Sequence, residues 1–249
     1  MHRGYAASSE VHIKSPLHRN HLLALLPEAD RQALVAQADM VSLQAYDELY
    51  PVDGPIEHVY FPLTMMASIL VEAGHRSEVD LATVGNEGMV GSMIVLQVLR
   101  AWGRTLVQVA GVAVKLPVAA LLTHLERQPL LHTILAQYQD AFTRQILQVS
   151  ACNLLHTMEE RCARWLLMTQ DRVGRATFAL TQQFLAQMLG VRRATVGLAL
   201  GLFKRAGLIT YVRGRFQIRD RAGLEAVACP CYAHITAAYQ RMQTELSRA

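Results

Sequence analysis

Long apolar runs are absent from this 249-residue sequence. No window approaches the roughly eighteen uninterrupted apolar residues of a membrane span. The opening residues, MHRGYAASSEVHIKSPLHRN, also lack the apolar core of a secretory signal. We therefore expect a cytoplasmic protein with no membrane partner. Apolar residues make up 52% of the chain, which is enough for the buried cores of two domains.

Cysteine is scarce and follows no familiar metal or disulfide pattern. The four cysteines are Cys152, Cys162, Cys229 and Cys231, with no CxxC pair and no histidines at zinc-finger spacing. A single proline separates Cys229 from Cys231, and we interpret this spacing as too close for a good chelate. The sequence therefore predicts reduced thiols, no metal and no cofactor.

Signature motifs of enzymes are missing as well. The chain contains no GxSxG, HExxH, Walker A or GxGxxG motif, and the nearest match, GNEGMVG at residues 85–91, has the wrong glycine spacing for a dinucleotide fold. We expect that the protein is not an enzyme.

Charge is distributed unevenly along the chain. Residues 1–156 contain 10 Lys and Arg against 14 Asp and Glu, a net charge of −4, whereas residues 157–249 contain 14 against 6, a net charge of +8. Such a basic segment favours a polyanionic partner, and nucleic acid is the polyanion we expect.

Short segments rich in Val, Ile, Leu and Thr dominate residues 41–116, and Pro or Gly separates them. Examples are HVYFP, MMASILVEA, EVDLATVG and RTLVQVAG. Many strands at close spacing favour a sandwich or barrel closed by turns. Residues 1–16 show no apolar periodicity, so we expect a flexible N-terminus there.

A long stretch without glycine or internal proline predicts one helix over residues 129–156. Its apolar positions recur at alternating spacings of three and four, the pattern of a coiled-coil seam. The predicted seam consists of Leu131, Leu135, Tyr138, Phe142, Gln145, Val149 and Cys152. We expect these side chains to pair with a second copy of the chain; packing against the chain's own β-domain is the alternative.

The stretch GVRRATVGLALGLFKRAGLI, residues 190–209, places four cations around an otherwise apolar helix. It follows LTQQFLAQMLG, in which Thr181 is a candidate N-cap and Gly190 a candidate helix end. One face of the second helix should pack inward through Val196, Ala199, Leu200 and Phe203. Two helices joined by a tight turn indicate a helix-turn-helix, whose second helix enters the DNA major groove.

Beyond that helix, LITYVRGRFQIRD alternates apolar and polar residues around RGR, which predicts a β-hairpin with a basic tip. Such a wing would contact phosphates, so we expect double-stranded DNA as the partner. The predicted DNA-binding residues are Thr181, Gln182, Arg192, Arg193, Ala194, Thr195, Leu198, Lys204, Arg205, Arg213 and Arg215. Two helices of an ordinary core would explain the apolar face but not the arginines.

The segment LTQQFLAQMLGVRRATVGLALGLFKRAGLI, the RGR wing and IRDRAGLE resemble the Crp-Fnr superfamily of bacterial transcription regulators, with weaker matches at VYFP and VGNEGMVG. The resemblance implies an α+β protein with a double-stranded β-helix (jelly-roll) sensor domain that is cyclic-nucleotide-binding-like. We expect a flexible N-terminus (1–16), the β-roll sensor domain (17–128), a dimerisation helix (129–156), a winged helix-turn-helix (157–228) and a C-terminal extension (229–249).

The nucleotide pocket of this superfamily is only partly matched. In its nucleotide-binding members a Gly-Glu pair holds the ribose and an Arg-Ser or Arg-Thr pair holds the phosphate, whereas here Ser92 replaces the glutamate. The candidate effector residues are Gly91, Ser92, Arg104 and Thr105, for an unknown effector; a cyclic-nucleotide-responsive regulator is the alternative. No cysteine precedes Cys152, so the N-terminal cysteines of the iron-sulfur branch are missing.

The DNA-reading positions differ from the superfamily too. Well-studied members carry a Glu after the first Arg of the recognition helix and an Arg four residues later, where this chain has Ala194 and Leu198. The preferred half-site should therefore differ, since leucine suits a thymine methyl group. We expect a homodimer that binds an inverted-repeat operator and contacts RNA polymerase. A dimeric interaction module that binds no DNA is the alternative from another class.

Overall fold

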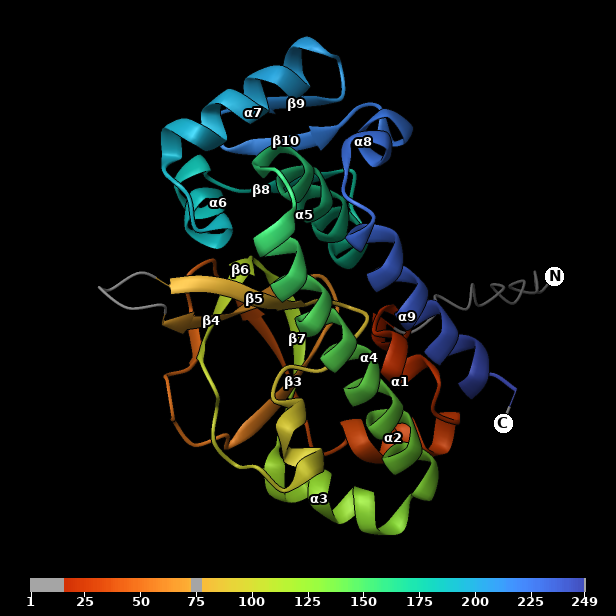
Figure 1. Ribbon diagram of the computed structural model, residues 1–249. Coiled ribbons are helices and arrows are strands. Elements are labelled where there is room, and N and C mark those ends of the chain that lie inside the picture. Colours follow the sequence, from red (N-terminus) through yellow and green to blue (C-terminus); the bar gives the residue numbers. More distant parts are fainter. Residues whose placement is uncertain (1–15, 73–77, 249) are drawn as a thin grey trace, which may run out of the picture.

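The computed structural model describes residues 16–72 and 78–248 (Figure 1). The N-terminal segment that we expected to be flexible lies outside the described residues, apart from Pro16. Pro16 opens a 3₁₀ turn, η1 (Pro16–Arg19), followed by α1 (His21–Ala24) and α2 (Glu28–Val35). Asn20 fixes this segment to the rest of the chain, because its side-chain amide donates to the backbone oxygens of Pro62 and Gly88 at 3.0 and 2.8 Å.

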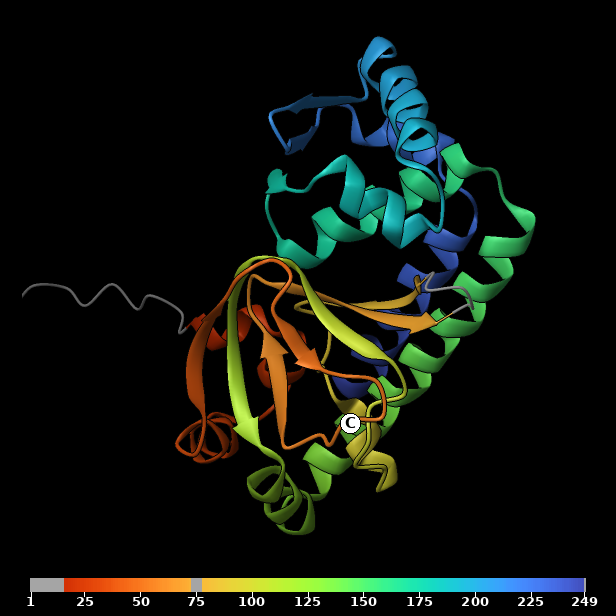
Figure 2. The ribbon, with the colours of Figure 1, turned by 90° about the vertical axis from the view of Figure 1, so that its left-hand side faces the viewer.

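Two antiparallel sheets form the β-roll, as the spacing of the short strands predicted. One sheet has the order β1-β7-β3 and the other β2-β6-β4-β5. The strands of the first are β1 (Asp39–Leu43), β7 (Gly111–Pro117) and β3 (His58–Pro62). The strands of the second are β2 (Glu48–Tyr50), β6 (Arg104–Val109), β4 (Met66–Glu72) and β5 (Glu78–Val84). Figure 2 shows the sheets wrapping around a shared interior.

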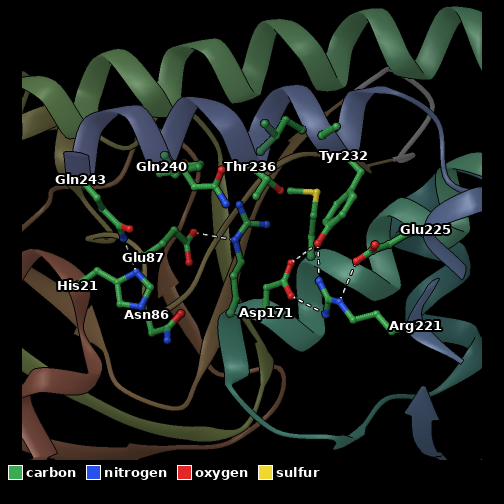
Figure 3. A pocket seen from close by; sticks show the side chains of 15 residues that line it. His21, Asn86, Glu87, Asp171, Arg221, Glu225, Tyr232, Thr236, Gln240 and Gln243 are labelled. Atoms are coloured by element: carbon green, nitrogen blue, oxygen red, sulfur yellow. Dashed lines mark hydrogen bonds and ion pairs between the residues drawn. The ribbon is translucent and has the colours of Figure 1, made fainter. Parts of the chain in front are cut away.

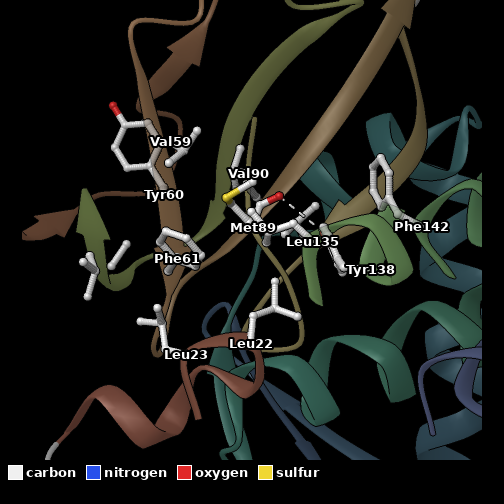
Figure 4. Packing of buried hydrophobic residues seen from close by; sticks show 14 of the residues in the cluster. Leu22, Leu23, Val59, Tyr60, Phe61, Met89, Val90, Leu135, Tyr138 and Phe142 are labelled. Carbon is white, nitrogen blue, oxygen red and sulfur yellow. Dashed lines mark hydrogen bonds between the residues drawn. The ribbon is translucent and has the colours of Figure 1, made fainter. Parts of the chain in front are cut away.

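Buried side chains join the β-roll to α4 (Pro129–Leu155) (Figure 4). Phe61 and Tyr138 are fully buried, and the Tyr138 ring stacks on Phe142 with centroids 5.9 Å apart. The Tyr138 hydroxyl donates to the backbone oxygen of Met89 at 3.4 Å. A Cβ atom at Gly88 would overlap the Tyr138 ring, so this approach requires glycine. The long helix is therefore part of the core of the β-roll.

The side chains of the predicted seam on α4 are all buried inside one chain. They pack against β5, against the 3₁₀ turn η2 (Ser92–Leu96) and against α9 (Cys231–Leu246). Helix α3 (Val118–Arg127) immediately precedes α4 in the chain. The alternative that we left open, packing on the chain's own β-domain, is the arrangement seen. Alternating spacings of three and four mark any helix packed along its length, whichever chain supplies the partner.

The C-terminal domain is built around a second core, which also includes Met66, Leu70, Leu106 and Val109 from the β-roll. It begins with α5 (Met158–Val173), for which Thr157 and Glu160 form a capping box, and Gly174 in the left-handed region ends that helix. A three-stranded sheet of order β8-β10-β9 and three further helices complete it. The elements are β8 (Thr177–Ala179), α6 (Gln182–Leu189), α7 (Arg193–Arg205), β9 (Ile209–Val212), β10 (Arg215–Ile218) and α8 (Arg221–Val227).

Helix α9 carries the chain back from the C-terminal domain and runs beside α4 (Figure 1). Its buried face, including Ile235, Tyr239 and Met242, joins the core of the β-roll. The extension to which the sequence gave no role thus packs against the β-roll. Within the described residues, no helix has the length and apolar character to span a membrane.

Candidate nucleic-acid interface

Helices α6 and α7 form the helix-turn-helix that the sequence predicted. The Thr181 hydroxyl accepts a hydrogen bond from the backbone N–H of Phe184 at 3.1 Å and so caps α6. Gly190, with φ of +65°, ends α6, and Arg192 is the N-cap of α7. The turn between the helices is therefore only three residues long, and both helix ends follow from local sequence.

Helix α7 presents two distinct faces. The predicted inward face is confirmed, because Val196, Ala199, Leu200 and Phe203 are buried. Arg192, Arg193 and Ala194 at its start are exposed, Thr195 is half-buried, and Leu198 is 71% exposed. Figure 1 shows α7 on the side of the C-terminal domain that faces away from the β-roll. Its first two turns can therefore be reached by a large partner.

Six cations surround this face without ion-pair partners. Arg192, Arg193, Lys204, Arg205, Arg213 and Arg215 are exposed, and none forms a salt bridge with any carboxylate of residues 16–72 or 78–248. Arg213 and Gly214 have φ of +48° and +77° and form the two-residue turn between β9 and β10. Such a turn matches the twist of a hairpin and aims the basic tip outward. The predicted wing is therefore present.

The start of α6 lies against the sensor domain. Tyr46 packs edge-on against Phe184 with ring centroids 4.9 Å apart, and its hydroxyl lies 3.4 Å from Thr181 Oγ1. Gln187 donates to Glu78 Oε2 at 3.2 Å. Thr181 is exposed and Gln182 half-buried, so both stay accessible at the edge of this contact. Helix α6 thus connects the β-roll to α7.

The predicted effector residues lie in two places, at the start of η2 and on strand β6. Gly91, with φ of +88°, precedes η2, and Ser92 is buried at its start. Arg104 lies on β6 and pairs with Glu78 at 2.7 Å and Glu48 at 3.7 Å. Thr105 is buried beside it on the same strand. The guanidinium that would hold a phosphate therefore already contacts two carboxylates.

A pocket of about 590 Å³ lies where the β-roll, α5, α8 and α9 meet (Figure 3). Asp171 pairs with Arg221 at 2.8 Å and accepts a hydrogen bond from the Tyr232 hydroxyl at 2.8 Å. Burial, and then the Asp171 carboxylate, raise the pKa of Tyr232. No sequence pattern predicted this pocket, because its lining comes from segments far apart in the chain. Its size and mixed lining suit a small polar ligand.

Three cysteines and one histidine meet below the C-terminal domain. The ligand atoms of Cys152, His156, Cys229 and Cys231 all lie within 4.8 Å of one another, and we call this group the Cys3His cluster. The thiols of Cys152 and Cys229 share a hydrogen bond at a sulfur separation of 3.4 Å. This hydrogen bond, together with the Arg164 charge, lowers the pKa of Cys152 to about 5. The sequence did not predict the group, because the Cys152–His156 pair and the Cys229–Cys231 pair lie more than 70 residues apart.

Known proteins resemble the chain in one domain by sequence and over most of its length by fold. Residues 160–227 match the model of the Crp-like helix-turn-helix domain. No curated protein sequence matches the chain.

Solved structures extend the likeness to the sensor part. A Crp/Fnr-family transcriptional regulator from Eubacterium rectale is 13% identical with a TM-score of 0.61, over 84% of this chain and 98% of that one. FixK2 from Bradyrhizobium japonicum is 18% identical with a TM-score of 0.59, over 77% and 98%. The c-di-GMP-responsive regulator CLP from Xanthomonas campestris is 13% identical with a TM-score of 0.59, over 77% and 99%. The chain therefore carries a Crp-like helix-turn-helix domain and has the fold of the Crp/Fnr transcription regulators.

Proposed function

We propose that the protein is a transcription regulator that binds an inverted-repeat DNA operator as a homodimer. The observation that carries this proposal is the exposed start of α7 together with six exposed cations on α7 and the wing, none of which forms a salt bridge within the described residues. A helix of this kind enters the major groove with its N-terminal residues on base edges, while the flanking cations contact phosphates. RNA polymerase is the further partner that we propose for a regulator of this class.

The dimer contact that we propose uses the exposed face of α4 rather than the buried seam. Leu147 and Leu154 lie seven residues apart on this face and are 66% and 85% exposed, and Leu155 is exposed beside them. Exposed leucines at heptad spacing are what a parallel helix partner would cover. A two-fold axis along this face would present two α7 helices, and operators of this type have half-sites roughly 34 Å apart.

The bases read by this dimer should differ from those read by regulators with a Glu and an Arg on the recognition helix. Ala194 offers no acceptor for cytosine, and the exposed Leu198 suits the methyl group of thymine. Arg193 remains the candidate for a guanine contact.

The sensor domain, we propose, responds to a ligand other than a cyclic nucleotide. Arg104 forms salt bridges with Glu78 and Glu48. Ser92 has no carboxylate with which to bind a ribose. The pocket between the β-roll, α5, α8 and α9 is the site that we propose for a small effector, because a ligand there touches both functional parts. Thr236→Trp, which fills this pocket, should abolish any thermal shift produced by such a ligand, whereas cyclic AMP should produce none with either protein.

The test of DNA binding is selection from a randomised duplex pool at low and moderate salt, followed by sequencing. The proposal predicts enrichment of a two-fold symmetric site with half-sites about ten base pairs apart. Arg193→Ala should lose the enriched sequence, whereas Arg127→Ala, an exposed arginine on α3, should not. Failure to enrich any site at either salt concentration would instead support the interaction module that binds no DNA.

A further inference from the structure

We propose that Cys152, His156, Cys229 and Cys231 bind one Zn²⁺ ion in a tetrahedral site. The four ligand atoms lie within 4.8 Å of one another, close enough to coordinate one cation. Zinc–sulfur bonds of about 2.3 Å place two sulfur ligands about 3.8 Å apart in a tetrahedron. The observed separations of 3.4 Å between Cys152 and Cys229, and of 3.5 Å between Cys231 Sγ and His156 Nδ1, are close to this value.

A disulfide accounts for less of this geometry. A bond between Cys152 and Cys229 would need a sulfur separation of about 2.05 Å and would leave Cys231 and His156 with no role. The three thiols are buried and form a small cluster apart from both main cores. All four ligand atoms lie close enough together to share one centre, which is what a four-coordinate ion requires.

The size of the Cys3His cluster favours one ion over an iron-sulfur cluster. An iron-sulfur cluster holds its protein ligands farther apart, because several irons and sulfides must fit between them. Three thiolates and a neutral imidazole are a common ligand set of structural zinc. The resulting complex carries a net charge of −1, which needs a nearby cation when it is buried.

Arg164 supplies that cation. Its side chain is buried, it acts electrostatically on both Cys152 and Cys229, and its Nε atom has no hydrogen-bond partner among the described residues. It also forms no salt bridge with a carboxylate in the described part of the chain. The carboxyl of Asp80 also interacts with this guanidinium, but burial raises the pKa of Asp80 to about 7, so the zinc complex would supply a second anion for a buried charge that forms no salt bridge.

The position of the Cys3His cluster gives the site a structural role. Cys152 and His156 lie at the end of α4, just before the C-terminal domain, whereas Cys229 lies between α8 and α9 and Cys231 begins α9, just after that domain. The matched helix-turn-helix domain, residues 160–227, lies entirely between the two ligand pairs. A bound ion would therefore join the entry and the exit of this domain at one point.

The first test uses the whole wild-type protein and needs no variant. Reduced protein, freed of metal by a chelator, is titrated with Co²⁺ and then with Zn²⁺. We expect one Co²⁺ per chain, the visible absorption of a tetrahedral ion with thiolate-to-cobalt charge transfer, and its displacement by one Zn²⁺. Absence of tetrahedral Co²⁺ absorption would overturn the proposal. So would purified protein that carries an iron-sulfide chromophore or a Cys152–Cys229 disulfide in place of zinc.

Two matched variants assign the ligands. His156→Ala should weaken Zn²⁺ binding by at least about tenfold and leave thiolate charge transfer to Co²⁺ in place. His132→Ala changes an exposed histidine on the same helix and should bind as wild type. Equal affinities in both variants would remove His156 from the site and contradict the proposed ligand set. Circular dichroism of both proteins confirms that they are folded.

Discussion

The guanidinium of Arg172 donates a hydrogen bond to the carboxylate of Glu87, with Nε and Oε1 2.7 Å apart, although the two residues are 85 positions apart and both are buried. Arg172 lies near the end of α5 in the C-terminal domain, and Glu87 lies in the β-roll. Arg172 also donates to Thr83 and Gln145, and a Cβ atom at Gly85 would overlap its side chain. The two parts of the molecule are therefore joined by a buried ion pair.

Glu87→Ala should lower the free energy of unfolding by about 3–5 kcal/mol, because it leaves the Arg172 charge buried without its partner. Urea denaturation measures the change. Asp140→Ala is the control, since it breaks the exposed pair with Arg144 and should cost less than about 1 kcal/mol. Similar losses in the two variants would mean that the Arg172–Glu87 pair is not buried in solution.

Asp80 should make stability depend on pH. Burial raises the pKa of this carboxyl to about 7, and among the described side chains only the Trp165 indole N–H donates to it, at 3.4 Å. Because an unfolded aspartate has a pKa of about 3.9, the folded chain binds one proton more between these values. The stability that this extra proton contributes to the folded state is fully present below about pH 4 and is lost as the pH rises through 7.

Asp80→Asn should therefore gain stability relative to wild type when the pH is raised from 5 to 8, as measured by urea denaturation at both values. The direction follows because the introduced amide has no charge to bury at the higher pH. Asp39→Asn, an exposed position on β1, corrects for the general loss of a carboxylate. A difference from wild type that is the same at pH 5 and pH 8 would argue against a titrating Asp80.

Gly201→Ala should stabilise the protein by about 1 kcal/mol, because Gly201 lies inside α7 and alanine is the better helix former. The added Cβ would lie 3.4 Å from Arg205 Nη1, the end of a flexible side chain that can move. Gly174→Ala is the control with the opposite sign, since its φ of +60° strains any residue with a Cβ. Thermal unfolding distinguishes them, and a lower midpoint for Gly201→Ala would show that α7 needs this glycine in the free protein.

Arg213→Ala should weaken DNA binding by a similar factor for all sequences and reduce the slope of log affinity against log salt concentration by about one. The reason is that we propose a phosphate contact, rather than a base contact, for the exposed wing tip. Fluorescence anisotropy at several salt concentrations measures the slope, with Arg127→Ala as control. An altered base preference with an unchanged slope would assign Arg213 to sequence reading instead.

If the proposed dimer forms through α4, Leu154→Glu should convert it to a monomer, because the substitution places a charge on the exposed apolar face of this helix. Analytical ultracentrifugation of wild type and variant measures the mass. Leu99→Glu is the control, because Leu99 is an exposed leucine that does not belong to α4. A dimer that survives Leu154→Glu but not Leu99→Glu would move the interface to the β-roll.

Local signals predicted the C-terminal domain well, because its structure depends on neighbouring residues. Thr181 caps α6, Gly190 ends it, and the Arg213–Gly214 turn forms the wing, each within a few positions of its partner. The buried face of α7 followed from the helical period alone.

Contacts between distant segments could not be predicted in the same way. The periodicity of α4 was visible, but nothing in it shows whether the buried face meets a second chain or the chain's own β-roll. The Cys3His cluster was missed for a related reason: a spacing rule treats Cys229 and Cys231 as a pair, whereas the fold adds Cys152 and His156 from another helix.

The return of α9 along α4 changes how the C-terminal domain can move. A domain at the end of a chain hangs from one connection and can swing and twist about it in any direction. Here two neighbouring chain segments hold the domain, one that enters it from α4 and one that leaves it to α9. Any rotation of this domain relative to the β-roll would also have to break the buried Arg172–Glu87 pair.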